Sequence, residues 1–214
     1  LSAMQFGDKS HVLIDIGGGS TELILADGHE ARALTSTKVG AVRIKRDFIK
    51  QDLISSQRCE FLRTFIEGSL DPAVTKIRRR LKNDEKPVMV ATSGTAMALG
   101  ALALNEEGSS NLKLQGYSVT KSMLDHLIEK LINMTPHQIK KLTPLSDRRS
   151  EIILPGALIL QTTMKMIGVD EFVLSERALR EGLVVDWMFR NGFLQDRYSL
   201  QGSIRQRTVL HQAK

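Results

Sequence analysis

Residues 11–26 constrain the fold more than any other segment of the chain. Two short apolar runs, HVLIDI and ELILA, flank the turn sequence GGGST. Apolar runs of this length, bounded by glycines, predict buried strands. Asp27 and Gly28 then precede a third such run at residues 31–36, and an Asp-Gly pair between two apolar runs indicates a hairpin. We therefore predict that the chain opens with three consecutive strands joined by tight turns.

Helices and single strands alternate after this opening. Residues 42–82 have helical spacing, and Asp71 followed by Pro72 predicts the start of a helix within them. The further elements expected are a strand at residues 87–92, helices at 96–104, 120–132 and 152–167, a strand at 171–174 and a helix at 178–189. This order predicts an α/β fold with a mixed sheet, arranged as in a ribonuclease H-like lobe.

Composition narrows the environment and the partners. The 214 residues are 42% hydrophobic, which suits one large or two small compact domains. Cys59 is the single cysteine, so an internal disulfide and a zinc site of several thiolates are both excluded, and a reduced cytoplasm is expected. No apolar stretch approaches the ~20 residues of a membrane helix, so no membrane partner is expected.

The net charge points to an anionic ligand. Lys and Arg outnumber Asp and Glu by 30 to 24, a net charge of +6 that attracts polyanions. Nucleic acid, phosphorylated metabolites and inorganic phosphate chains all carry the required charge. Aromatic residues are only 5% of the chain, which leaves few platforms for stacked bases. Specific nucleic-acid binding is therefore the least favoured of the three.

The glycine turn carries the strongest chemical signal. Asp15 ends a buried strand immediately before it, where a carboxylate can hold Mg²⁺. Glu22 follows the turn and can orient an attacking water molecule. Backbone N–H groups and hydroxyls suited to phosphate oxygens are provided by Gly17, Gly18, Gly19, Ser20 and Thr21. The open alternative is a plain glycine-rich turn capped by the aspartate.

Other motifs are weaker or absent. No Walker sequence occurs, and a dinucleotide fingerprint would need a glycine where Glu22 stands. Gly94 and Thr95 join an expected strand to a helix whose N-terminus would face an anion favourably, although such turns are often only structural. The basic segment at residues 76–82 is either a polyanion track or, more simply, a solvated helix face. Arg180 and Glu181 follow the last expected strand and are either ligand contacts or a surface ion pair.

Five segments together resemble a known family. They are VLIDIGGGSTELIL, VGAVRIKRDFI, ATSGTAMALGAL, RSEIILPGALIL and SERALREGLVVDWM, found in this order over residues 12–188. They are similar to the exopolyphosphatase and guanosine pentaphosphate phosphohydrolase (Ppx/GppA) family. The resemblance implies the superfamily of actin, sugar kinases and heat-shock ATPases, in which two ribonuclease H-like lobes close on a phosphate-filled cleft.

The resemblance also implies a division of the chain. Residues 1–10 would be the end of a first lobe, residues 11–190 the second lobe, and residues 191–214 a linker with the start of a C-terminal helical domain. Members of the family carry, ahead of the glycine motif, a first lobe with its own phosphate loop and a glutamate expected to be the general base. Neither feature precedes residue 11 in this sequence.

Roles for residues follow from the same resemblance. It implies that Asp15 helps to hold Mg²⁺, that Glu22 positions the water, and that Gly94, Thr95 and Arg149 contact the phosphates beside the glycine turn. The implied reaction is Mg²⁺-assisted hydrolysis of the terminal phosphoanhydride of inorganic polyphosphate or guanosine pentaphosphate, and homodimers are implied as well. The alternatives are a non-catalytic phosphate- or nucleotide-binding module and an actin-like or sugar-kinase-like ATPase.

Overall fold

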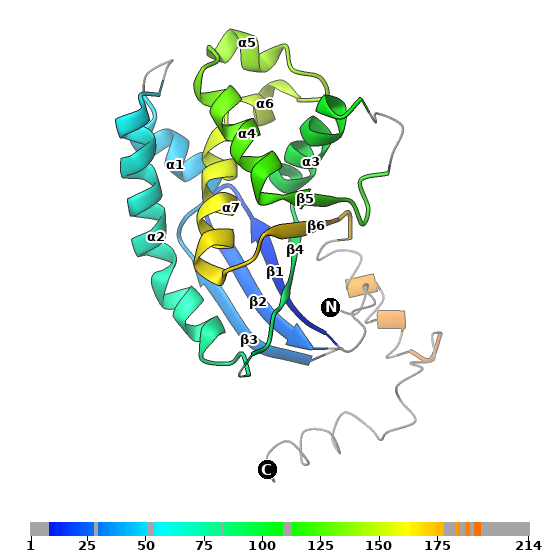
Figure 1. Ribbon diagram of the computed structural model, residues 1–214. Helices are drawn as coiled ribbons and strands as arrows, with labels where there is room; N and C mark the ends of the chain where they lie inside the picture. The colour runs from blue at the N-terminus through cyan, green and yellow to red at the C-terminus, as the bar shows by residue number, and fades with distance from the viewer. Residues whose placement is uncertain are drawn as a thin grey trace.

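The computed structural model describes residues 9–27, 30–50, 54–82, 84–108, 113–177, 183–184, 187–188 and 191–193 (Figure 1). Its strands are β1 Ser10–Ile16, β2 Thr21–Asp27, β3 Glu30–Thr37, β4 Val88–Thr92, β5 Ser118–Thr120 and β6 Glu171–Ser175. Its helices are α1 Ala41–Phe48, α2 Ser56–Arg78, α3 Gly94–Glu106, α4 Lys121–Ile132, α5 Pro136–Lys140, α6 Asp147–Ser150 and α7 Ile153–Ile167.

The strands form one mixed sheet in the order β3-β2-β1-β4-β6-β5. The first three strands are antiparallel neighbours, whereas β4 runs parallel to both β1 and β6. The predicted opening of three strands and the predicted α/β class with a mixed sheet are confirmed. The short edge strand β5 was not predicted, because three residues are too few to show a two-residue period.

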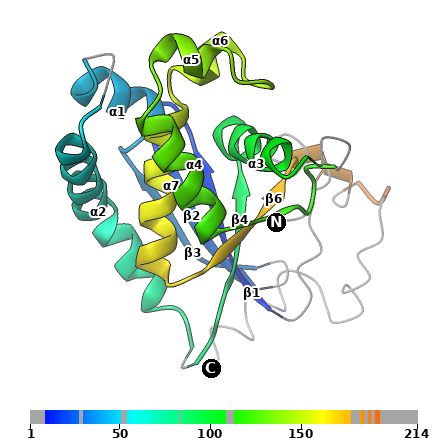
Figure 2. The same ribbon diagram turned by 45° about the horizontal axis from the view of Figure 1, so that its top comes forward.

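One face of the sheet is covered by helices (Figures 1 and 2). Helix α7 lies at the centre of this layer and contacts β1 as well as α1, α2, α3 and α4. The strands contribute fully buried side chains such as Ile14, Leu23 and Met89 to the resulting core. A second, small apolar cluster of Leu13, Ala26 and Val90 belongs to the alternate side chains of the same strands, which point to the other face.

The predicted helix start at Asp71 and Pro72 is wrong. Helix α2 is continuous from Ser56 to Arg78, with Pro72 inside it. Buried residues such as Ile66, Leu70 and Val74 lie on both sides of the proline, so packing of one continuous face outweighs the lost hydrogen bond. Pro72 and Gly68 are exposed, so water can solvate the carbonyl group that loses its helical donor.

The other helix predictions fare better. The helices expected at 96–104, 120–132 and 152–167 appear as α3, α4 and α7, with Thr120 capping α4 through its hydroxyl. Pro155 occupies the first turn of α7, where the missing N–H group has no helical partner to lose. The helix expected at 178–189 and the tail 194–214 lie largely or wholly outside the described residues. None of the described helices has the length and apolarity needed to cross a membrane.

An ion pair joins β3 to the loop before β4. Arg32 Nη1 lies 2.7 Å from Glu85 Oε1, and the backbone N–H of Lys82 donates to Glu85 Oε2 at 2.7 Å. The bond to Arg32 is the main reason that the pKa of Glu85 falls from 4.5 to about 2. The lowered pKa means that the interaction stabilises the fold above pH 4.5 and is lost as the pH falls toward 2.

We expect Glu85→Gln to lower the free energy of unfolding by about 1 kcal/mol at neutral pH, because the charged pair is replaced by a neutral one. The difference from the wild type should narrow as the pH falls from 4.5 toward 2. Urea unfolding at a series of pH values measures it. Glu67→Gln, which removes an exposed pair with Lys165, is the control and should change little. An equal loss of unfolding free energy in Glu85→Gln at every pH would contradict a stabilising role for the charged Glu85.

Candidate functional site

The carboxyl ends of the parallel strands meet at one edge of the sheet. Asp15 near the end of β1 is in register with Thr92 at the end of β4, and Thr92 is in register with Ser175 at the end of β6. The glycine turn follows β1, and α3 follows β4 after Ser93 alone. The fold therefore brings both predicted loops to the edge where ligands of such sheets bind.

The glycine turn is fixed in place by α1. The carbonyl groups of Gly17 and Gly18 accept hydrogen bonds from the backbone N–H groups of Ala41 and Arg43, both at 3.0 Å. These bonds satisfy the first N–H groups of α1, whose N-cap residue Gly40 provides no side-chain cap. The carbonyl groups of the turn are thereby directed toward the helix.

The N–H groups of the turn are left available on its other side. Gly17 N–H closes the turn on the carbonyl oxygen of Ser20 at 2.9 Å, but those of Gly18, Gly19 and Ser20 have no acceptor among the described residues. Gly18 and Gly19 are exposed, and a Cβ added to Gly19 would meet no atom within 4 Å. Such a row of free N–H groups is suited to an anion.

Two of the predicted phosphate contacts instead build the turn. Gly17 uses its N–H group in the bond just described, and the buried Thr21 hydroxyl donates to the carbonyl oxygen of Val39 at 2.6 Å. These bonds hold the ends of the turn together and to the segment that leads into α1. The free donors of the turn are therefore those of Gly18, Gly19 and Ser20.

Asp15 and Glu22 lie directly opposite each other on β1 and β2. Opposed residues of antiparallel strands project from the same face, so the two carboxylates are neighbours. Burial is the main cause that raises the pKa of Asp15, and the charge of Glu22 adds to it; no cationic side chain is among the causes. Among the described residues Asp15 has no cationic partner, and a half-buried carboxylate beside a second one then has the donor chemistry of a divalent cation site.

The two carboxylates at this edge are a suitable number for a Mg²⁺ ion that also contacts a phosphate substrate. Within the described ranges, no group of three or more His, Cys, Asp or Glu side chains is placed to hold a metal ion. Mg²⁺ commonly takes one or two protein carboxylates and fills its other positions with water and phosphate oxygens. Asp15 and Glu22 fit that pattern.

The second loop adds a cation and a helix N-terminus. A Cβ built on Gly94, the first residue of α3, would lie 2.9 Å from Arg149 Nη2, so the guanidinium group covers this end of the helix. A cation beside the positive end of a helix dipole is unfavourable without an anion between or beside them. Gly94 and Arg149 are both exposed and together favour a phosphate group at this position.

Thr95 is placed differently from the prediction. Its side chain is buried, and a Cβ built on Gly156 of α7 would lie 2.2 Å from Thr95 Cγ2. The residue therefore packs α3 against α7. Ser93, the N-cap residue of α3, has φ 137°, a strained value for a non-glycine residue. Its hydroxyl accepts a hydrogen bond from the N–H of Ala96 at 3.1 Å.

Sequence reasoning missed three residues at this edge. Gly40 contacts the turn directly, Arg43 Nε donates to the Gly19 carbonyl oxygen at 3.3 Å, and Ser36 Oγ donates to Glu22 Oε1 at 2.8 Å. The available signal for Gly40 was a glycine at the position before a helix, where a residue with a capping side chain is usual. The positions of Arg43 and Ser36 follow from tertiary packing and strand register, which the sequence pattern did not specify.

The basic segment at residues 76–82 lies away from the site. It precedes β4, whereas the site follows the carboxyl end of β4. Lys76 Nζ donates to the Leu34 carbonyl oxygen, and Arg78 donates to the Met166 carbonyl oxygen. These bonds support a structural role for part of the segment. Arg180 and Glu181 lie outside the described residues.

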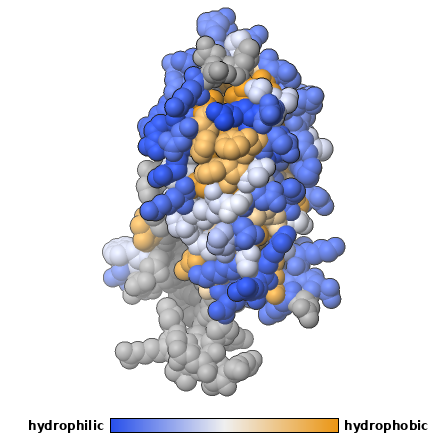
Figure 3. Space-filling model, turned by 90° about the vertical axis from the view of Figure 1, so that its left-hand side faces the viewer, coloured by the Kyte–Doolittle hydropathy of each residue, from blue (hydrophilic) through white to orange (hydrophobic). Residues whose placement is uncertain are grey.

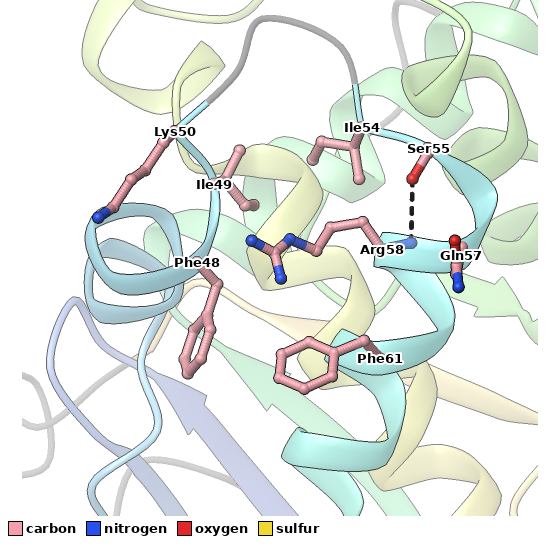
Figure 4. Close-up of a pocket in the computed structure, with 8 residues that line it drawn as sticks. All are labelled: Phe48, Ile49, Lys50, Ile54, Ser55, Gln57, Arg58 and Phe61. Carbon is pink, nitrogen blue, oxygen red and sulfur yellow. Dashed lines mark hydrogen bonds between the residues drawn. The ribbon is translucent and has the colours of Figure 1, made fainter.

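A hollow of about 580 Å³ between α1 and α2 contains none of the predicted site residues (Figure 4). Phe48 and Phe61 line it, and the Arg58 guanidinium lies 5.5 Å from the Phe61 ring. On the side formed by these helices, an apolar area is surrounded by hydrophilic side chains (Figure 3). The exposed large apolar side chains of α1 and α2 are Val42, Phe61 and Phe65. The hollow is therefore distinct from the glycine turn.

Comparison with known proteins decides the family. The sequence profile of the Ppx/GppA phosphatase family matches residues 1–191. The chain belongs to the Ppx/GppA phosphatase family. It is 30% identical to a guanosine-5'-triphosphate,3'-diphosphate pyrophosphatase of Vibrio vulnificus over 95% of this chain and 41% of that protein. It is 27% identical to exopolyphosphatase 2 of Mycobacterium tuberculosis over 81% of this chain and 54% of that protein.

Solved structures agree with this family and its fold. The Ppx/GppA family member of Aquifex aeolicus matches with a TM-score of 0.74 and 25% identity, over 86% of this chain and 57% of that one. An exopolyphosphatase of Cytophaga hutchinsonii matches in fold, with a TM-score of 0.77 and 18% identity, over 88% of this chain and 59% of that one. The chain thus spans about half the length of the relatives that it matches.

Gly40→Ala tests the contact between the turn and α1. A Cβ at this position would lie 2.5 Å from the backbone of Gly18, so we expect a loss of about 2 kcal/mol in the free energy of unfolding. Gly68→Ala is the control, because it adds a Cβ to α2 that meets no atom within 4 Å and should stabilise by about 0.5 kcal/mol. Equal effects of the two substitutions in urea unfolding would show that the contact does not constrain the turn.

Asp15→Asn tests the electrostatics of the carboxylate pair. A pKa raised in the folded state means that the charged Asp15 destabilises the fold at neutral pH and ceases to do so once the pH falls below its ordinary pKa of 3.8. We therefore expect the variant to melt at a higher temperature than the wild type at pH 7, with a difference that shrinks in acid. Asp71→Asn on the exposed surface of α2 is the control. A lower melting temperature at pH 7 would contradict the assignment.

Proposed function

We propose that this chain supplies one wall of a phosphohydrolase site that removes the terminal phosphate from inorganic polyphosphate, guanosine pentaphosphate or both. The observation that carries the proposal is the row of N–H groups at Gly18, Gly19 and Ser20 that have no acceptor among the described residues, beside the paired carboxylates Asp15 and Glu22. Relatives named exopolyphosphatase and guanosine-5'-triphosphate,3'-diphosphate pyrophosphatase support the reaction class and both substrates.

The N–H groups of the turn would bind the terminal phosphate. N–H donors hold phosphate oxygens and stabilise the charge that develops on them during transfer. Arg149 and the N-terminus of α3 would bind a neighbouring phosphate of the same chain, because they form a second positive position at this edge. Two such positions favour a substrate with consecutive phosphates over a single phosphate ion.

The carboxylates would hold Mg²⁺ and water. Asp15 and Glu22 would repel a phosphate group unless a cation lay between them and it, so both are the residues that would bind Mg²⁺. When bound, Mg²⁺ supplies neutralisation of charge on the phosphate oxygens. Glu22 would also orient water, whose oxygen bonds to the terminal phosphorus while the bond from that phosphorus to the bridging oxygen breaks. The water proton passes to a base, which the family resemblance assigns to a glutamate ahead of the glycine motif.

The second candidate is a phosphate- or nucleotide-binding module without turnover. A module that only binds phosphate would use the same N–H groups and Arg149. The two carboxylates that the described residues provide at this edge would both be needed to bind Mg²⁺, so their presence does not by itself require catalysis. Phosphate release distinguishes the candidates. Adenine nucleotide that binds more tightly than polyphosphate would instead favour an actin-like or sugar-kinase-like ATPase.

Calorimetric titration of long-chain polyphosphate in the presence of Mg²⁺ tests the binding half of the proposal. We expect Asp15→Ala to weaken binding about tenfold, a change of ~1.4 kcal/mol, because a Mg²⁺ ligand is lost. Asp71→Ala changes the net charge by the same amount at an exposed position of α2 and should bind like the wild type. With EDTA in place of Mg²⁺ the loss in Asp15→Ala should disappear. If both variants bind polyphosphate equally and the binding is lost at moderate salt, the interaction is a non-specific attraction between polyphosphate and the surface charge of the protein.

The same proteins then decide between hydrolysis and binding. For this assay each protein is joined to a first lobe of the family that carries the glutamate ahead of the glycine motif. Phosphate release from polyphosphate or guanosine pentaphosphate, reduced in Asp15→Ala but not in Asp71→Ala, supports the phosphohydrolase. Specific binding with no release from either substrate, even with the first lobe attached, would favour the module without turnover.

A further inference from the structure

A row of three polar side chains crosses the sheet at the candidate site. Asp15 on β1 is in register with Glu22 on β2, and Glu22 is in register with Ser36 on β3. Residues opposed in adjacent antiparallel strands lie on one face, so the three side chains are spatial neighbours across the sheet from β1 to β3. Nothing in the glycine motif or in the predicted loops pointed to Ser36.

Ser36 holds one oxygen of the Glu22 carboxylate. Its Oγ donates to Glu22 Oε1 at 2.8 Å, an ordinary hydrogen-bond length. A glutamate has three side-chain torsions, and one bond to a neighbouring strand selects among their rotamers. Oε2 has no partner among the described residues, so it remains available for water or a cation.

The hydrogen bond from Ser36 counteracts the electrostatic repulsion between the Asp15 and Glu22 carboxylates. Asp15 and Glu22 carry like charges on adjacent strands, and their interaction contributes to the raised pKa of Asp15. Ser36 lies on the other side of Glu22, so its hydroxyl holds the carboxylate toward β3. Without this bond, repulsion and rotamer freedom would let the Glu22 carboxylate move away from a single position.

The bond contributes little to the stability of the fold. Ser36 is exposed, and hydrogen bonds at exposed positions contribute little because water replaces them. The strand pairing of β2 with β3 depends on backbone bonds that a side-chain substitution leaves intact. A change at Ser36 should therefore affect the position of Glu22 without unfolding the chain.

We propose that Ser36 is a positioning residue that fixes the Glu22 carboxylate, and with it the water or cation held by Glu22. The catalytic consequence rests on the phosphohydrolase function proposed above. A displaced water-orienting group slows the chemical step and leaves ground-state binding of the phosphate chain largely unchanged. Loss of the hydroxyl should therefore lower kcat more than it changes KM.

Three variants test this inference, each compared with the wild type in the presence of Mg²⁺. Ser36→Ala removes the hydroxyl, and Ser36→Thr keeps it on a residue that strands accommodate well. Ser69→Ala removes an exposed hydroxyl of α2 that bonds only the Phe65 carbonyl oxygen of its own helix. The melting temperature and the ¹³C resonance of the Glu22 side-chain carboxylate, assigned with Glu22→Gln, are measured on this chain. The kinetic readouts, kcat and KM for phosphate release, are measured on the same chain joined to a first lobe of the family that carries the glutamate ahead of the glycine motif.

We expect Ser36→Ala to shift the Glu22 carboxylate resonance and to lower kcat about tenfold at nearly constant KM and melting temperature. Ser36→Thr should restore both values, and Ser69→Ala should match the wild type. An unmoved Glu22 resonance in Ser36→Ala, or unchanged kcat in a protein that turns over, would overturn the proposal. If the wild-type chain joined to such a first lobe releases no phosphate, the proposed function fails, and the resonance alone then supports or overturns the positioning of Glu22 by Ser36.

Discussion

The contact between the glycine turn and the N-terminus of α1 determines the chemistry at this edge of the sheet. The carbonyl groups of Gly17 and Gly18 accept hydrogen bonds from N–H groups in the first turn of α1. Because Gly40 has no Cβ, the backbone before α1 can lie directly against the backbone of Gly18. Since the carbonyl groups are engaged by the helix, the N–H groups of the next residues are directed away from it. One set of bonds therefore caps the helix and leaves a row of donors for an anion.

The sheet arranges the remaining groups around that turn. Strand register places Asp15, Glu22 and Ser36 in one row, and the parallel pairing of β1 with β4 brings the start of α3 to the same edge. Arg149 reaches this helix end from α6. In the proposed phosphohydrolase, these elements would provide donors for two phosphates and carboxylates for Mg²⁺ and water. The burial that raises the pKa of Asp15 lowers the stability of the fold while no cation is bound. Such a loss of stability is typical of residues placed for function rather than for stability.

Local sequence patterns predicted the elements that have strong local signals. Glycine turns and short apolar runs predicted the opening strands and the central strand, and helical spacing of apolar residues predicted α4. The prediction failed at Pro72, where packing along one continuous face keeps α2 intact, and at β5, which exists because β6 provides its edge. Tertiary packing overrides local preference in both cases.

The candidate site shows the same division. Asp15, Glu22 and the glycines were evident from their order along the chain, but their individual tasks were not. Gly17 and Thr21 hold the turn and Thr95 packs against α7, whereas Gly40, Arg43 and Ser36 act at the site through contacts between distant segments. Which backbone donors remain free depends on a complete account of hydrogen bonds, and a sequence motif does not contain that account.

The availability of the turn N–H groups to a phosphate chain is the central claim, and amide spectra of the ¹⁵N-labelled protein test it most directly. Inorganic tripolyphosphate would be added in the presence of Mg²⁺ at constant ionic strength. The account predicts large, saturable shifts of the amide resonances of Gly18, Gly19 and Ser20, with Gly94 following and the amides of residues 76–82 unaffected. Shifts confined to the basic end of α2, with the turn amides unmoved, would contradict it.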